Sequence, residues 1–283
     1  MASFMSSKFR VQSSKSKAVR NFKSKTEDQK PKIENSKNII FGTLPVLESL
    51  RANSRKIEKI FFAEGAREKR LDEIFRLARE KNVLLQKASR ENLDRMVDGG
   101  ANAKHQGIIA IVAAAEYADA DELLAEIAAK ENSLTLILDG VEDPRNLGAI
   151  LRCAECAGVD GVFIPERRAV GLTETVAKSS AGATEYVRVA KVGNLNRLID
   201  ELKSNNIWVI GASGEAEMIY SDWDWTRKTA LVLGGEGKGL HRLTAEKCDA
   251  LVKIPMRGKI ESLNVSVAAG VILFEAIRQR PKD

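Results

Sequence analysis

Residues 134–164, LTLILDGVEDPRNLGAILRCAECAGVDGVFI, decide how the larger part of the chain folds. The run LTLIL at 134–138 is mostly apolar and has the length of a buried strand, and GVFI at 161–164 has the same character. Residues 149–157 between them are expected to form a helix. Strands and helices that alternate with short connections indicate a parallel sheet with helices on both faces.

The same alternation continues to the end of the chain. It predicts an α/β domain over residues 121–283, in which ligands bind beyond the carboxyl ends of the parallel strands. The further elements expected are strands at 185–190, 207–210, 230–233 and 251–254 and helices at 173–180, 195–204 and 265–280.

A smaller α/β unit is expected before this domain, over residues 38–114. Short apolar runs predict its strands, and charged amphipathic stretches predict its helices. The small and acidic residues at 114–121 are interpreted as a linker or as the beginning of the next helix. The unit would contain strands at 38–42, 57–63, 83–85 and 108–113 and helices at 43–51, 67–81 and 90–97.

The first 37 residues differ in composition from the rest of the chain. Serine and lysine dominate, no apolar period is sustained, and we expect disorder. The segment carries a net charge of +7 while the whole chain carries +6, so the body is almost neutral. A basic tail fits a phosphate-binding arm for RNA, a solubilising extension or an organelle transit peptide.

Composition excludes several classes of protein. Three cysteines, Cys153, Cys156 and Cys248, are too few for a disulfide framework and suit a reducing compartment, so a cytoplasmic location is expected. No apolar stretch approaches the ~20 residues that span a bilayer. Two histidines make a zinc site improbable, and no metal is expected. The pair Cys153 and Cys156 is interpreted as small buried residues that pack a helix, not as a redox pair.

Three loops that follow predicted strands carry unusual residues. They are DGVEDPRNLG at 139–148, GGEGKG at 234–239, and IPMRG at 254–258, which continues to SLNVS at 262–266. The glycine-rich loop at 234–239 has neither the Walker A spacing nor the dinucleotide G-x-G-x-x-G spacing. What remains is a loop whose backbone can approach a ligand closely and which holds one carboxylate, Glu236.

Taken together, the three loops resemble the motifs of the SpoU/TrmH family of SPOUT RNA ribose 2′-O-methyltransferases. NLGAILR at 146–152 matches its N-x-G-x-x-x-R motif, LGGEGKGL at 233–240 the second, and the segment 254–268 the third. The resemblance covers residues 38–280, because the first unit resembles the family's ribosomal-protein-like RNA-binding domain. KHQGI at 104–108 is typical of the subgroup that modifies a guanosine of large-subunit ribosomal RNA.

The resemblance implies a fold and partners that composition does not reveal. The last strands and the final helix would form a trefoil knot, a rare exception to unknotted topology. S-adenosylmethionine would be the cofactor and RNA the partner, with large-subunit rRNA ahead of transfer RNA, and the chain would act as a homodimer. Neither DNA nor membrane is expected as a partner. The cofactor-binding residues would be Gly234, Gly235, Ile254, Met256, Leu263 and Ser266.

The resemblance also implies five catalytic residues: Arg152, Asn146, Glu236, Ser262 and Asn264. Arg152 is the family's usual base, although a guanidinium is ordinarily protonated, so we favour an arginine that clamps the phosphate beside the target ribose. Asn146 would orient Arg152, receive the target hydroxyl or cap its helix, and Glu236 would orient Asn146 or Arg152. The rival readings are a non-catalytic RNA-binding factor of the same fold and a base-methylating relative.

Overall fold

The computed structural model describes residues 38–64, 69–97, 100 and 104–281. The basic segment 1–37 and its three interpretations lie outside the described residues. The described strands form two sheets, one of four strands and one of seven. No helix in these ranges is long and apolar enough to cross a membrane.

The four-stranded sheet is built around β4 (Ile108–Val112), in which every residue is buried. It pairs antiparallel with β1 (Asn38–Phe41) and with β2 (Ile57–Ala63), and β2 pairs in parallel with β3 (Leu84–Ala88). Because β4 is central and uniformly apolar, both of its faces must be covered.

Three helices cover this sheet. Alternate residues of β4 pack with α1 (Thr43–Ala52) and α2 (Lys69–Glu80), and the residues between them pack on the other face with α3 (Arg90–Met96). The mixed α/β unit expected from the sequence is therefore present. The expected start of α2 at residue 67 lies outside the described residues.

The seven-stranded sheet is parallel throughout and confirms the predicted fold class. Its order, β7-β6-β5-β10-β8-β11-β9, puts β5 beside β10, although about 90 residues separate them in the chain. The strands are β5 (Leu134–Asp139), β6 (Gly161–Pro165), β7 (Val189–Val192), β8 (Trp208–Ala212), β9 (Met218–Ile219), β10 (Thr229–Gly234) and β11 (Ala250–Lys253).

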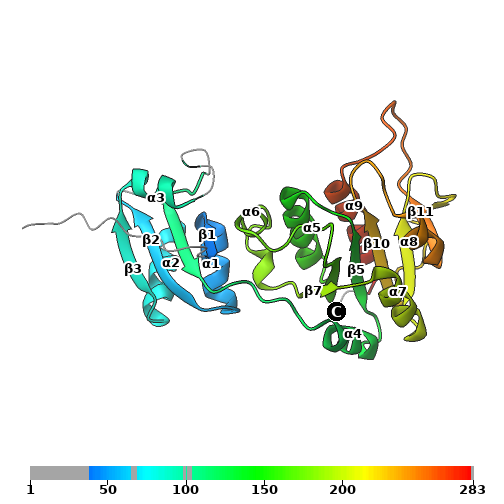
Figure 1. Ribbon diagram of the computed structural model, residues 1–283, viewed down its shortest axis with the longest axis horizontal. Helices are drawn as coiled ribbons and strands as arrows, with labels where there is room; N and C mark the ends of the chain where they lie inside the picture. Colours follow the sequence, from blue (N-terminus) through cyan, green and yellow to red (C-terminus); the bar gives the residue numbers. More distant parts are fainter. Residues whose placement is uncertain (1–37, 65–68, 98–99, 101–103, 282–283) are drawn as a thin grey trace, which may run out of the picture. The chain divides into compact units, whose positions relative to one another are not determined.

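Helices cover both faces of this sheet, as predicted. One face packs against α5 and α9, and the other against α4 and α7. Figure 1 shows α5 and α9 beside β5 and β10, and it shows the loop between β11 and α9 extending away from the strands. The helices are α4 (Ala120–Ala129), α5 (Pro144–Cys156), α6 (Glu174–Ser179), α7 (Leu195–Ser204), α8 (Arg242–Lys247) and α9 (Val265–Gln279), with a 3₁₀ helix η2 (Ala183–Glu185).

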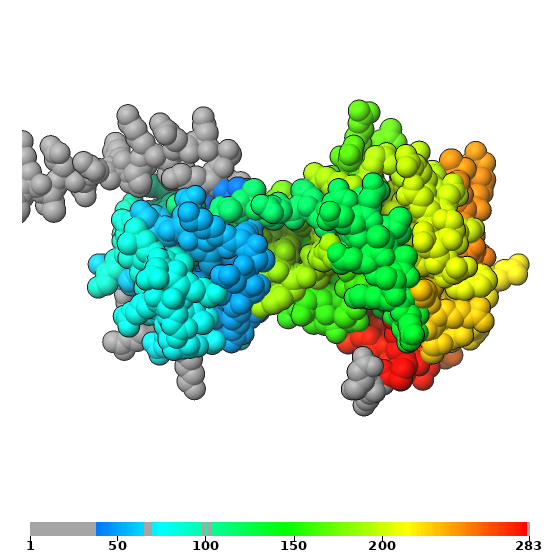
Figure 2. Space-filling view, turned by 90° about the horizontal axis from the view of Figure 1, so that it is seen from below, coloured from blue at the N-terminus to red at the C-terminus, as the bar shows by residue number. Residues whose placement is uncertain are grey.

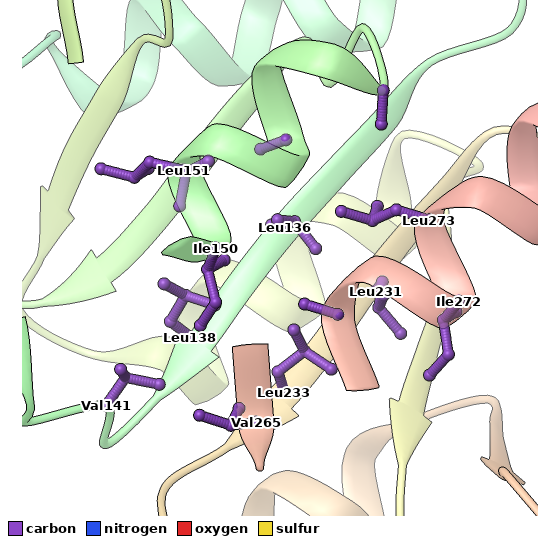
Figure 3. Packing of buried hydrophobic residues seen from close by; sticks show 14 of the residues in the cluster. Leu136, Leu138, Val141, Ile150, Leu151, Leu231, Leu233, Val265, Ile272 and Leu273 are labelled. Carbon is purple, nitrogen blue, oxygen red and sulfur yellow. The ribbon is translucent and has the colours of Figure 1, made fainter. Parts of the chain in front are cut away.

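The core between the sheet, α5 and α9 holds the functional loops in place. Leu136 and Leu231 of the central strands meet Ile150 of α5 and Leu273 of α9 in Figure 3, and all four are fully buried. Burying a side chain of this size contributes about 1.5–3 kcal/mol. Because α5 and α9 share this core, the segments that precede them are brought to the same end of the sheet.

Three local expectations are wrong. Helix α5 begins at Pro144, not at 149, because Asp143 caps it and proline suits the first helical turn. Glu185 lies in η2, so the strand expected at 185–190 is confined to β7. Cys156 is exposed, not buried, since it lies on the outer side of α5.

Glu185 takes part in a buried ion pair that joins two distant parts of the chain. Its carboxylate accepts hydrogen bonds from the Arg55 guanidinium and, at 2.6 Å, from the hydroxyl of Ser54. The side chains of Arg55 and Glu185 are 9% and 2% exposed. A carboxylate this deeply buried requires such a partner, which explains why the local strand pattern at 185 is overridden.

Candidate active site

A cavity of about 470 Å³ lies at the carboxyl ends of β8, β10 and β11. Its walls are the ends of these strands, the glycine-rich loop after β10 and the segment that leads into α9. Open parallel sheets bind their ligands at this end. Five of the six predicted cofactor-binding residues line the cavity: Gly234, Gly235, Ile254, Met256 and Leu263.

The sixth, Ser266, belongs to the start of α9. Its backbone N–H and its hydroxyl both donate to Oδ1 of Asn264, at 2.9 and 2.6 Å. Asn264 is therefore the N-cap of α9. The cap fixes the side chain of Asn264 at the edge of the cavity, which Asn264 itself lines.

The glycine-rich loop folds back tightly on itself. The N–H of Gly239 donates to the carbonyl of Gly235 at 3.1 Å, and a Cβ on Gly234 would lie 2.0 Å from the Gly239 carbonyl carbon. A Cβ on Gly235 would lie 2.2 Å from the carbonyl oxygen of Gly140. Glycine is thus required at both positions by close backbone packing, of the loop on itself at Gly234 and of the loop on Gly140 at Gly235.

The three motif loops converge on one hydrogen-bonded cluster of Asn146, Glu236 and Asn264. The amide nitrogens of Asn146 and Asn264 both donate to Oε1 of Glu236, the latter at 3.1 Å. Asn264 also donates to Oδ1 of Asn146 at 3.0 Å. Asn146 is 8% exposed. The Glu236 carboxylate thus contacts both amides and lines the cavity.

Asn146 enters the cluster from the first turn of α5. Asp143 is the N-cap, accepting from the N–H of Arg145 at 2.6 Å, so Asn146 does not cap this helix. Its amide is left to bridge Glu236 and Asn264. This removes one of the three functions that the sequence left open for Asn146.

The cavity suits S-adenosylmethionine. Its volume is in the usual range for cofactor sites, and Leu233, Ile254 and Leu263 provide an apolar wall for a purine. Strand ends of β10 and β11 present backbone groups there. Two carboxylates, Glu236 and Glu261, are at its edge and would favour a positively charged group. Ser262, the remaining predicted catalytic residue of the third motif, also lines it.

Arg152 lies away from this cluster within one chain. It follows Asn146 by six residues on the same helix, so it points about 120° away from it. Its exposed side chain lines a separate cavity of about 290 Å³, together with Glu48, Glu155 and Tyr186. The structure therefore brings together the three motifs but leaves the predicted catalytic arginine outside, and Asn146 does not orient it within the chain.

Tyr186 donates its phenolic hydrogen to Glu48 at 2.7 Å beside Arg152. Burial and this hydrogen bond raise the pKa of Tyr186 to about 12. The phenol consequently remains a neutral donor at physiological pH, and the positive charge of Arg152 has no phenolate next to it.

Sequence reasoning missed why Gly148 is glycine in the first motif. A Cβ there would lie 1.9 Å from the hydroxyl oxygen of Ser179, so α5 and α6 could not pack as they do. Ser179 also donates to the carbonyl of Pro144 at 3.2 Å. The signal was present as the small residue Ser179 at the end of α6, but only contacts between the helices reveal its meaning.

The thiols do not form a reactive pair. Burial raises the pKa of Cys153, and partial desolvation together with the neighbouring Glu155 raises the pKa of Cys156, so both remain weakly nucleophilic thiols. Among the residues that the structure describes, no group of three or more His, Cys, Asp or Glu side chains could hold a metal ion.

Two family models match the chain. The model of the SpoU rRNA methylase family matches residues 133–274, and a model described as RNA 2′-O ribose methyltransferase substrate binding matches residues 39–118. The first match includes the Asn146–Glu236–Asn264 cluster and the cavity beside it. The second coincides with the four-stranded sheet and its helices.

Individual proteins agree with these matches. YacO of Bacillus subtilis (strain 168), assigned to the TrmH family of tRNA/rRNA methyltransferases, is 45% identical over 242 residues, which cover 85% of this chain and 95% of YacO. A crystal structure of an RNA 2′-O ribose methyltransferase is 26% identical with a TM-score of 0.70, covering 85% of this chain and 88% of that one. AviRb of Streptomyces viridochromogenes, crystallised with AdoMet, shares the fold at 23% identity and a TM-score of 0.70, with 85% and 89% covered.

Proposed function

Because the chain belongs to the SpoU rRNA methylase family and is an S-adenosylmethionine-dependent RNA methyltransferase, we propose that it methylates a ribose 2′-hydroxyl of a guanosine in large-subunit ribosomal RNA. The observation that carries the reaction is the convergence of Asn146, Glu236 and Asn264 at one cavity. The segment KHQGI at 104–108 favours the rRNA guanosine. Transfer RNA is the second candidate, since the family of the relatives covers both RNAs.

Different residues at the cavity bind the cofactor and orient the side chains that face the RNA. S-adenosylmethionine supplies an electrophilic methyl group when it is bound there. Gly234, Ile254 and Leu263 would hold its adenosine part through the backbone and the apolar wall. Asn146 and Asn264 fix the Glu236 carboxylate between them, so its orientation is set before RNA arrives. Ser262 at the cavity edge would donate a hydrogen bond to the ribose or to the cofactor.

The attacking hydroxyl must lose its proton, since a ribose 2′-hydroxyl is a poor nucleophile. A protonated Arg152 would clamp the adjacent phosphate and lower the pKa of the hydroxyl. In this scheme Arg152 stabilises the developing oxyanion and is not itself the proton acceptor. The proton of the hydroxyl passes to solvent water as the oxygen takes the methyl group, and S-adenosylhomocysteine leaves. A neutral arginine acting as the base is the alternative, and the lysine variant described in the Discussion separates the two.

A homodimer explains why Arg152 lies outside the cavity of its own chain. Helix α9 exposes Val267, Phe274 and Ile277, which are 51%, 51% and 37% exposed. Their spacing puts them on one side of the helix, as expected of a surface that a second copy covers. We place Arg152 of one protomer at the cavity of its partner in this dimer. Three free cysteines suit the reducing cytoplasm as the site of action.

Mixing two inactive variants tests this arrangement. Chains with Arg152→Ala and chains with Glu236→Ala are each expected to be inactive alone. When the two variants exchange subunits at random, half of the dimers contain one chain of each kind. In such a mixed dimer, the site that has Glu236 receives an intact Arg152 from the partner, and the other site lacks both residues. One site in four is then complete, so about a quarter of the wild-type activity should return. If each chain used its own arginine, no mixed dimer would contain an intact site and no activity would return.

Mapping 2′-O-methyl groups tests the substrate. RNA from a strain that lacks this protein should miss one ribose methylation of a large-subunit rRNA guanosine, and the purified protein should restore it with a labelled methyl donor. A missing methyl group in transfer RNA would select the second candidate. Intact methylation of both RNAs would refute the proposed substrates.

A further inference from the structure

The segment between β4 and α4 is attached to the edge of the seven-stranded sheet. The N–H of Ala118 donates to the carbonyl of Val189 at 2.9 Å, and Ala118 forms a parallel bridge with Ala190 of β7. In Figure 2 this part of the chain, coloured green, runs along the surface as a continuous band. The linker therefore has a defined position on the catalytic domain just before α4 begins.

Tyr117, the residue before this parallel bridge, contacts the catalytic domain with its side chain. Its hydroxyl oxygen accepts a hydrogen bond from the backbone N–H of Leu172 at 2.9 Å. The ammonium group of Lys191 lies 4.1 Å from the centre of its ring, within the range of a cation–π contact. Its ring packs against the core that α5 and α9 share. These contacts hold Tyr117 from three sides.

The residues that Tyr117 touches are next to those that hold the first-motif loop. Val170, two residues before Leu172, donates its N–H to the carbonyl of Val141 at 3.2 Å. The hydroxyl of Ser179, at the end of the helix that follows, lies 3.2 Å from the carbonyl oxygen of Pro144 and 2.8 Å from that of Thr175, and shares its hydrogen between them. The loop from Val141 to Pro144, which leads into α5, thus contacts the segment 170–179 at both ends.

We propose that Tyr117 is a positioning residue that sets the loop before α5, and with it Asn146, through Leu172 and Val170. It ties the linker of the RNA-binding domain to the start of the helix that presents Asn146 to Glu236. The inference rests on the proposed function for its kinetic consequence, whereas the structural link stands on hydrogen bonds in residues 117–179. Loss of the hydroxyl would leave the Leu172 N–H without this acceptor.

A substitution at Gly171 offers a second test of the hydrogen bond between Tyr117 and Leu172. A Cβ there would lie 2.9 Å from the hydroxyl oxygen of Tyr117, which is closer than such atoms approach. Alanine at 171 would therefore push the hydroxyl off the Leu172 N–H. Removing the hydroxyl in the same chain would make room for that methyl group, so the two substitutions are expected not to add.

The experiment compares Tyr117→Phe with Tyr220→Phe in the full-length protein. Tyr220 is the matched control, because it also packs partly buried against the same core. Amide hydrogen exchange at Leu172 and Val170 should accelerate about fivefold in Tyr117→Phe, the equivalent of one net hydrogen bond, and stay unchanged in Tyr220→Phe. Single-turnover methyl transfer at saturating RNA should slow by about the same factor, with unaltered affinity for S-adenosylmethionine.

The double variant supplies the decisive outcome. Gly171→Ala alone should slow methyl transfer, and Gly171→Ala with Tyr117→Phe should be no slower than Tyr117→Phe alone. Unchanged exchange at Leu172 and Val170 in Tyr117→Phe overturns the structural link, whether or not the protein methylates RNA. Faster exchange with an unchanged transfer rate overturns the positioning of Asn146. An inactive wild-type protein would count against the proposed function instead, and the exchange result would still decide the link.

Discussion

Replacing Arg152 with alanine is expected to slow methyl transfer by about 10²–10⁴-fold, while the affinity for S-adenosylmethionine stays within a few-fold. The rate falls because no cation remains beside the ribose to stabilise the developing oxyanion. The cofactor still binds because Arg152 lies outside the cavity formed by the ends of β8, β10 and β11. Single-turnover rates with labelled donor and direct binding of the donor measure the two quantities separately.

The control removes another exposed arginine, from the opposite face of the sheet. Arg197 of α7 lies on the surface and pairs with Glu201 one turn further along the same helix, so Arg197→Ala should leave the transfer rate nearly unchanged. Arg152→Lys keeps the charge: a phosphate clamp would retain part of the activity with an unchanged pH dependence, whereas a base would shift the rise of the rate to lower pH, because the pKa of lysine is below that of arginine. If Arg152→Ala instead abolished donor binding, Arg152 would belong to the cofactor site.

Local sequence patterns predicted the fold class because each buried strand is visible as an apolar run of five or six consecutive residues. β5 and β6 lie within the first stretch that the sequence singles out, and the alternation of apolar runs and amphipathic segments predicted a parallel sheet covered on both faces. The strand order could not be predicted in this way. The pairing of β5 with β10 depends on contacts between segments about 90 residues apart.

The candidate site was predictable as a set of loops but not as a geometry. Asn146, Glu236 and Asn264 were selected from three separate motifs, and the structure joins them. The helix start expected at 149 left open how Asn146 and Arg152 are directed relative to each other. The pair Asp143–Pro144 is a helix-start signal, and its use would have put Asn146 and Arg152 on one continuous helix, pointing in different directions.

Glu185 shows where a local sequence pattern gives the wrong secondary structure. The sequence EYVRVA has the alternation of a strand, yet its first residue belongs to η2 and pairs with Arg55, which is 130 residues away. A local pattern cannot report a requirement set by a distant charge. The Tyr117–Leu172 hydrogen bond escapes sequence analysis for the same reason, because it joins residues 55 positions apart.

Arg55→Ala is expected to lower the free energy of unfolding by about 3–5 kcal/mol, because it strands the buried carboxylate of Glu185. Ser54 alone would then donate to that carboxylate, and one hydroxyl does not offset the loss of a guanidinium. Urea unfolding is monitored with two signals, one from the four-stranded sheet and one from the seven-stranded sheet. It therefore measures the loss of unfolding free energy in each part.

Arg51→Ala is the matched control, since Arg51 is 44% exposed and its pairs with Glu48 and Glu73 are at the surface. Its loss should cost no more than about 1 kcal/mol. In Arg55→Ala with Glu185→Ala, the stranded charge is gone and part of the stability should return. If the double variant were as unstable as the sum of the two single variants, the cost would come from lost packing and not from an unpaired charge. Equal effects of Arg55→Ala and Arg51→Ala would mean that water reaches Glu185 in solution.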